Sequence, residues 1–246
     1  MKNTLKVNYL YNSGFYVETE NHILIFDYYL DTPSLSVKGL EHGVVNFYDL
    51  KDTNKKIFVF ATHSHFDHFN PVIFTWQKNI KNITYVLSND IKTNHNGDNV
   101  NFMAPYDSLK LDDITVNAFG STDLGSSFLI NVDNIDIFHS GDLNWWDWFD
   151  ESREYNLEME KNFKNEIHKI KKHNVDITFF PVDPRLKDKF YLGGEYFINN
   201  LHPKYFIPMH FGENFEITKL FSNKILHLDT KIIEIHHRGE TFSLKL

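Results

Sequence analysis

The residues that most constrain this chain are the seven at 62–68, Thr-His-Ser-His-Phe-Asp-His, which follow directly on a continuous apolar strand pattern. Imidazole nitrogens and carboxylate oxygens are ligands that zinc and its first-row neighbours take in proteins. If the backbone leaves the strand in extended form, His63 and His65 project to the same side and can share one ion. Asp67 and His68 lie past the bend and can bind a second. Because an ordinary polar loop has no reason to place four ligands at this spacing, the run predicts half of a metal centre.

Composition restricts the partners of the chain. Its 246 residues include 25 Lys+Arg and 33 Asp+Glu, a formal net charge of -8, so the average field repels phosphate backbones and disfavours long nucleic acids. The absence of cysteine excludes disulfides and thiolate ligands, so nitrogen and oxygen must hold any metal. There is no apolar segment of signal-peptide or membrane-span length. We therefore expect a cytoplasmic protein with a small-molecule substrate and no membrane partner.

Hydrophobic patterning predicts a strand-rich start followed by alternation of strands and helices. The first three strands form a meander with short turns, and Asn70 and Pro71 supply the cap and first-turn proline of a helix. We expect strands at 5–10, 14–19, 23–28, 57–61, 84–87, 114–119, 127–132, 135–138, 175–181, 205–209 and 231–235, and helices at 71–79, 151–172, 194–201 and 215–223.

This order of elements predicts an α/β fold. Two mixed β-sheets flanked by helices are the economical packing for it, and a chain of this length can form one domain over 1–246. The helix at 151–172 places Leu157, Phe163, Ile167 and Ile170 at helical spacing, so we expect them on its buried face.

Two later side chains also follow predicted strands and could complete a metal site. Asp142 comes after the strand at 135–138, across a glycine turn where the backbone can approach an ion, and is a candidate bridge between two metals. His210 comes after the strand at 205–209 and is the natural third ligand for the ion held by Asp67 and His68.

These motifs resemble those of the metallo-β-lactamase superfamily. Its signature His-X-His-X-Asp-His stands here at 63–68, the opening meander ends in Phe26-Asp27, and the family's later motifs match Ser140-Gly141-Asp142 and Pro208-Met209-His210. Within the superfamily the chain looks most similar to the group related to ascorbate-6-phosphate lactonase, which shares the Gly-Phe opening and the Ser-Gly-Asp turn. The resemblance implies a four-layer αβ/βα sandwich, two divalent metal ions (zinc first, manganese or iron otherwise) and hydrolysis by a metal-bound hydroxide.

The chain departs from the family at one position. The family usually has a histidine after the strand at 114–119 to complete the first metal site, and Ser121 stands there instead. Two readings are open: Asp123 supplies the missing ligand, or Asp123 caps a turn beside a weakened site.

The sequence also suggests which residues take part in the reaction and in substrate binding. Asp67 would ligate one ion, orient the attacking water and accept its proton, which makes it the predicted catalytic residue. Arg185 could pair with an anionic substrate, or form an ion pair with a neighbouring acid. Trp145, with Trp146 and Trp148, could wall a substrate pocket, or serve as core or a dimer contact.

Three functions are consistent with the sequence. The first is a metal-dependent hydrolase of a small, anionic ester, lactone or phosphoester. The second is a metal-dependent phosphodiesterase or nuclease, against which the net acidity counts. The third is an iron-dependent oxidoreductase on the same scaffold.

Overall fold

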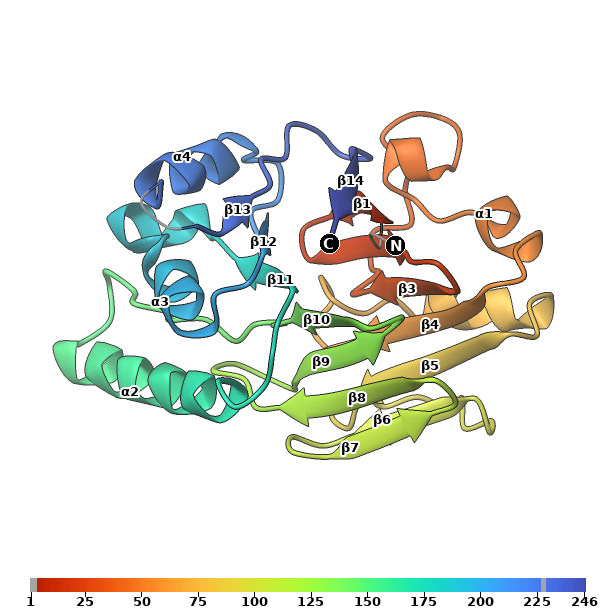
Figure 1. Cartoon of the computed structure of the whole chain (residues 1–246), viewed down its shortest axis with the longest axis horizontal. Coiled ribbons are helices and arrows are strands. Elements are labelled where there is room, and N and C mark those ends of the chain that lie inside the picture. Colours follow the sequence, from red (N-terminus) through yellow and green to blue (C-terminus); the bar gives the residue numbers. More distant parts are fainter. Residues whose placement is uncertain (1–3, 227–228) are drawn as a thin grey trace. The chain divides into compact units, whose positions relative to one another are not determined.

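The computed structural model describes residues 4–226 and 229–246. The chain divides into two compact units (Figure 1): unit 1 comprises Met1–Met103 and His236–Leu246, and unit 2 comprises Ala104–Ile235. Each unit contains one seven-stranded sheet. That the whole chain forms one domain stays a prediction.

The sheet of unit 1 is half antiparallel and half parallel. β14, β1, β2 and β3 pair antiparallel, and β3, β4, β5 and β6 pair parallel. The central strands β3 and β4 are buried almost throughout, as expected of apolar runs covered on both faces. The strands are β1 (Thr4–Tyr11), β2 (Gly14–Glu18), β3 (His22–Phe26), β4 (Lys56–Ala61), β5 (Ile83–Ser88), β6 (Val100–Met103) and β14 (Thr241–Lys245).

Short helices pack against this sheet. α1 (Phe47–Lys51) buries Leu50, and the 3-10 helices are η1 (Leu40–His42) and η2 (Pro71–Lys78). The predicted cap of η2 is confirmed: the Asn70 side chain accepts a hydrogen bond from the Val72 N–H, and a proline opens the helix. Trp76 of η2 joins a buried cluster with side chains of β3, β4 and β5, which fixes the loop between β4 and η2 at both ends.

The sheet of unit 2 follows the same plan. β7, β8, β9 and β10 pair antiparallel, and β10, β11, β12 and β13 pair parallel. The strands are β7 (Ser108–Leu111), β8 (Ile114–Phe119), β9 (Ser127–Val132), β10 (Ile135–His139), β11 (Ile177–Pro181), β12 (Tyr205–Met209) and β13 (Lys231–Ile232). The two mixed sheets with helices that the sequence predicts are thus confirmed.

The helices of unit 2 are α2 (Arg153–Ile170), η3 (Pro184–Lys189), α3 (Leu192–Leu201) and α4 (Glu216–Lys224). α2 contacts α3 and β8, and α3 contacts β11 (Figure 1). Phe163, Ile167 and Ile170 are buried on α2 as predicted, but Leu157 is 53% exposed. That prediction was wrong because Leu157 lies six residues before Phe163, which turns it roughly 120° away from the buried stripe at 3.6 residues per turn.

Most of the predicted strands and helices are present within a few residues of their predicted bounds. The elements that the sequence reading missed are α1, β6, β7 and β14 and the 3-10 helices η1 and η3. Among residues 4–226 and 229–246, no helix is both long and apolar enough to cross a membrane.

Candidate metal centre

The predicted histidine run lies in the loop after β4 of unit 1. The His68 and Phe69 N–H groups both donate to the His65 carbonyl, at 3.1 Å each, so the chain turns back on itself directly after β4. This turn brings three imidazoles together: the ring centroid of His63 lies 4.7 Å from that of His65 and 4.0 Å from that of His68. The loop therefore brings the three histidines together, and which of them share an ion stays a prediction.

Asp27, the residue after β3, organises this cluster. It is fully buried and has a left-handed backbone with φ of 41°. Its carboxylate accepts hydrogen bonds from the Thr62 N–H (2.8 Å), the Thr62 hydroxyl (2.7 Å) and His68 Nδ1 (2.7 Å). A buried carboxylate that receives three donors holds each of them in one orientation.

These bonds set the tautomers of two histidines. Since His68 Nδ1 donates to Asp27, the lone pair of the neutral ring lies on Nε2. The Thr62 hydroxyl hydrogen is directed at Asp27, so its oxygen accepts from His63 Nδ1, at 3.1 Å, and places the His63 lone pair on Nε2 as well. Carboxylate or hydroxyl support of Nδ1 is what metal-binding histidines typically have.

The remaining residues of the loop are anchored by neighbouring elements. Asp67 lies beside His68, with 3.8 Å between Asp67 Oδ2 and His68 Nε2, and accepts a hydrogen bond from Asn12 Nδ2 at 3.3 Å. The Ser64 N–H donates to Asp90 Oδ2 at 2.8 Å, which fixes the backbone between the first two histidines of the run.

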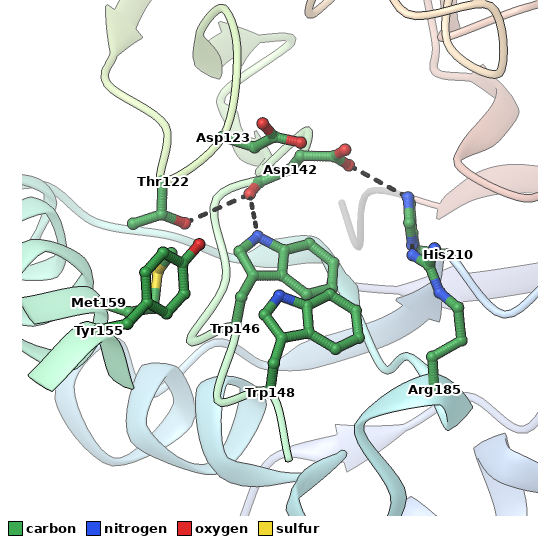
Figure 2. A pocket seen from close by; sticks show the side chains of 9 residues that line it. All are labelled: Thr122, Asp123, Asp142, Trp146, Trp148, Tyr155, Met159, Arg185 and His210. Carbon is green, nitrogen blue, oxygen red and sulfur yellow. Dashed lines mark hydrogen bonds and ion pairs between the residues drawn. The ribbon is translucent and has the colours of Figure 1, made fainter. Parts of the chain in front are cut away.

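Unit 2 brings together the other two predicted ligands, Asp142 and His210. Asp142 follows β10 past Gly141, whose φ of 52° makes the turn, and His210 follows β12 with φ of 66°. Both side chains are buried, and His210 Nε2 lies 3.4 Å from Asp142 Oδ1 (Figure 2). The other nitrogen, His210 Nδ1, lies 2.9 Å from Asp183 Oδ2. An acid thus orients this imidazole too, with Nε2 toward Asp142.

Arg185 forms the ion pair that was one of its two predicted roles. Its Nε donates to both oxygens of Asp183, at 3.0 and 2.9 Å, and Nη2 donates to Oδ2 as well. Burial alone would raise the pKa of Asp183, but hydrogen bonds from His210 and Arg185 outweigh it and hold that pKa below its ordinary value. Asp183 is therefore a carboxylate at neutral pH; a contact between Arg185 and substrate stays a prediction.

A pocket of about 200 Å³ lies beside these residues within unit 2. Figure 2 shows Asp123 and Asp142 at one end, Tyr155 and Met159 of α2 together on one side, and two tryptophans below. Its lining comprises Thr122, Asp123, Asp142, Trp146, Trp148, Tyr155, Met159, Arg185 and His210.

Trp145 does not line this pocket. Its ring packs between elements of unit 2, with centroids 6.2 Å from Phe163 of α2 and 6.3 Å from Tyr196 of α3, and Lys164 Nζ lies 4.5 Å from its centroid. The structure assigns the pocket wall to Trp146 and Trp148, two of the three tryptophans in the predicted segment.

Asp123 lies in the turn after β8. Its N–H donates to Ser121 Oγ at 3.2 Å, as in a capped turn, while its side chain lines the same pocket as Asp142. The turn and the ligand role are therefore compatible, and coordination by Asp123 stays a prediction.

The predicted ligands of each unit are of the kinds that a first-row divalent cation takes. They are imidazoles and carboxylates without thiolate, and three of the histidines, two in unit 1 and one in unit 2, have Nδ1 bound to a carboxylate or hydroxyl. The sequence reading did not identify Asp27 and Asp183 as the residues that hold these rings. The available signal was that each is an acid at the end of an apolar strand pattern.

Comparison with solved structures decides the fold. No protein-family model matches the chain, and no curated protein matches it in sequence. The metallo-β-lactamase fold protein YhfI from Bacillus subtilis is similar over 98% of this chain and 99% of its own, with 11% identity and a TM-score of 0.58. The chain has the metallo-β-lactamase fold. Igni18, a metallo hydrolase from Ignicoccus hospitalis, is similar over 99% of both chains, with 17% identity and a TM-score of 0.64.

Not every protein of similar structure is described as a hydrolase. CmlA, a diiron β-hydroxylase from Streptomyces venezuelae, has a TM-score of 0.64 at 12% identity, and the match covers 99% of this chain but 54% of CmlA. The metallo-β-lactamase fold therefore hosts more than one chemistry, and the reaction must be argued from the site.

Proposed function

We propose that this protein is a metal-dependent hydrolase. The observation that carries the proposal is the paired support of its imidazoles: Asp27 holds His68 and Asp183 holds His210, each through Nδ1. Such carboxylate–histidine pairs orient Nε2 for a metal and raise its basicity. The proposed ligands are His63, His65, Asp67, His68, Asp123, Asp142 and His210.

The side chains of the site then have separate tasks. Two divalent cations, most simply zinc, with manganese or iron as alternatives, would supply Lewis acidity and lower the pKa of water to about 7. Asp67 orients the attacking water and accepts its proton. Asn12, which donates to Asp67 Oδ2, keeps that carboxylate in place during the transfer.

The proposed substrate is a small, anionic ester, lactone or phosphoester. Support for a hydrolytic reaction comes from the metallo hydrolase Igni18, and the lactone class is suggested by the sequence resemblance to the ascorbate-6-phosphate lactonase-like group. Because Asp183 already neutralises Arg185, the attraction for an anion would come mainly from the cations. A cytoplasmic location, without membrane or long nucleic acid as partner, stays part of the proposal.

Two other reactions are the alternatives. A phosphodiesterase or nuclease would need to overcome the net charge of -8. An iron-dependent oxidoreductase remains an alternative because the chain is similar in structure to the diiron hydroxylase CmlA. Metal analysis of protein purified without added metal tests this last case, because zinc or manganese without iron would exclude it.

The test of hydrolysis is the substitution Asp67→Asn. The amide cannot accept the proton and binds a cation weakly, so we expect most of kcat to be lost on any lactone, thioester or phosphodiester that the wild type cleaves, while circular dichroism stays unchanged. Turnover that survives both this substitution and chelation would contradict the mechanism.

A further inference from the structure

We propose that the pocket of unit 2 binds a planar aromatic group of the substrate. The proposal rests on the proposed function, since it names the substrate class of that site. It is argued from the tryptophan wall, the opposing side chains of α2, the size of the pocket and the placement of its charges.

Two parallel indole rings form one wall of the pocket. Trp146 and Trp148 stack with an interplanar angle of 3° and ring centroids 5.6 Å apart. A centroid separation this large between stacked rings is an offset arrangement, so the two indoles lie in separate parallel planes and overlap only in part. The part of an indole face that its neighbour leaves uncovered offers a stacking surface to a planar ring.

The wall is also fixed before any ligand arrives. Trp146 Nε1 donates to the Asp142 carbonyl at 2.9 Å, which ties one indole to the backbone of a predicted metal ligand. The backbone of Trp148 is tied to α2 on both sides, because its N–H donates to Asn156 Oδ1 (3.0 Å) and its carbonyl accepts from Asn156 Nδ2 (2.7 Å). The Trp148 ring itself is held by its stack on Trp146 and by Arg185, whose Cζ lies 5.5 Å from the ring centroid, so little side-chain freedom remains to be lost when a ligand binds.

Two side chains from α2 line another side of the pocket. Tyr155 and Met159 are four residues apart and therefore lie on one face of the helix, and Figure 2 shows them side by side at the pocket. A phenol ring and a thioether both make favourable contacts with aromatic rings. A ring bound in the pocket would therefore contact aromatic side chains from two parts of the chain, the segment 146–148 and α2.

The size of the pocket and the position of its charges further restrict the ligand that it can bind. A volume of about 200 Å³ is below the range of about 300 to 1,000 Å³ that holds drug-sized ligands, so the pocket suits a group the size of one ring. The carboxylates of Asp123 and Asp142 lie at the end away from the tryptophans, as Figure 2 shows. The reacting carbonyl would face the carboxylate end, and the ring would lie against the indoles.

The experiment compares two anionic esters of equal carbon count, monomethyl terephthalate and monomethyl cyclohexane-1,4-dicarboxylate, with each rate divided by that ester's alkaline hydrolysis rate. We expect kcat/KM to favour the aromatic ester by about 2- to 10-fold, the size of an aromatic pair's contribution beyond buried area. Trp148→Leu should abolish this preference, and Trp148→Phe should retain it. Trp145→Phe is the matched control from the same segment, and it should retain the preference because Trp145 lies outside the pocket. A preference that is absent in the wild type, or unchanged in Trp148→Leu, would overturn the inference.

A binding measurement separates this inference from the proposed function. Benzoate and cyclohexanecarboxylate are titrated into the metal-loaded protein while tryptophan fluorescence is recorded. If neither these esters nor any lactone, thioester or phosphodiester is cleaved but benzoate binds more tightly, and Trp148→Leu removes the difference, the hydrolase proposal fails and the aromatic site stands. If esters are cleaved without regard to the ring, and benzoate binds no better than its saturated counterpart, the aromatic site fails and the hydrolase stands. Absence of both cleavage and benzoate binding refutes both.

Discussion

Asp27→Asn should weaken metal binding far more than it weakens the fold. Asparagine preserves the size of the side chain and tolerates the left-handed backbone at this position, where φ is 41°. Its oxygen can still accept from the Thr62 N–H, but its NH₂ group would face both the Thr62 hydroxyl and His68 Nδ1, which donate to Asp27 in the wild type. To avoid two opposed donors, His68 must move its proton to Nε2, and the lone pair that would bind a cation is lost.

The magnitudes differ for the two effects. The change of a supporting carboxylate behind a metal-binding histidine costs about 10- to 100-fold in metal affinity. For the fold, the three charge-assisted hydrogen bonds to Asp27 are lost or become neutral, and at about 1 kcal/mol each the free energy of unfolding should fall by about 3 kcal/mol. Asp27 is fully buried, so solvent screening does not reduce this figure.

The assay is zinc titration against a competing chelator, with urea unfolding of the chelated protein in parallel. Asp49→Asn is the matched control: Asp49 also accepts a backbone hydrogen bond, from Asn46 at 2.8 Å in the capping box of α1, but it touches no histidine of the site. We expect the control to lose about 1 kcal/mol of stability and to keep its zinc affinity. An Asp27→Asn protein with wild-type zinc affinity would refute the assignment of Asp27 as the residue that orients His68.

Three further predictions follow from the site. Asp123→Ala should bind roughly one metal equivalent where the wild type binds two, and Ser121→His should tighten the weaker site; unchanged stoichiometry on titration would reduce Asp123 to a turn cap. Because the pKa of Asp183 is depressed, its stabilisation is present above the ordinary carboxyl pKa of about 3.9 and is lost as pH falls through the folded value. Asp183→Asn should therefore be less stable at pH 6 and lose less stability below about pH 4, as measured by urea unfolding; parallel pH curves would contradict this. Chelation should lower the melting temperature, because a cation at 100 times its dissociation constant adds about 2.7 kcal/mol to the folded state, and a melting temperature indifferent to chelator and added zinc would show that no such site exists.

The parts of the fold that sequence could predict are those with a strong local signal. Continuous apolar runs predicted the central strands, and Asn70 with Pro71 marked a helix start that the structure confirms. The elements missed at the sheet edges, β6 and β7, are four residues long and keep several side chains at least partly exposed. An edge strand buries too little to impose a clear hydrophobic period on its sequence.

The site was predictable where its residues are close in sequence and was missed where they are not. The histidine run at 62–68 can be recognised as a candidate ligand set because three imidazoles fall within a few positions. The role of Asp27 and Asp183 in orienting His68 and His210 could not be recognised in this way, because a single acid after a strand is common in any α/β protein. Trp145 was chosen over its neighbours for the same reason: along an irregular segment, sequence does not say which ring turns toward α3 and which toward the pocket.

The two orienting acids nevertheless obey one structural rule. Asp27 follows β3 and His68 follows β4, and these strands pair in parallel; Asp183 follows β11 and His210 follows β12, and these also pair in parallel. The carboxyl ends of neighbouring parallel strands meet at one edge of a sheet, so an acid after one strand reaches a histidine after the next. The separations of 41 and 27 residues are set by the crossover between the strands and hide the pair from any local motif. A histidine that follows a parallel strand is therefore best tested as a ligand by looking for an acid after the strand beside it.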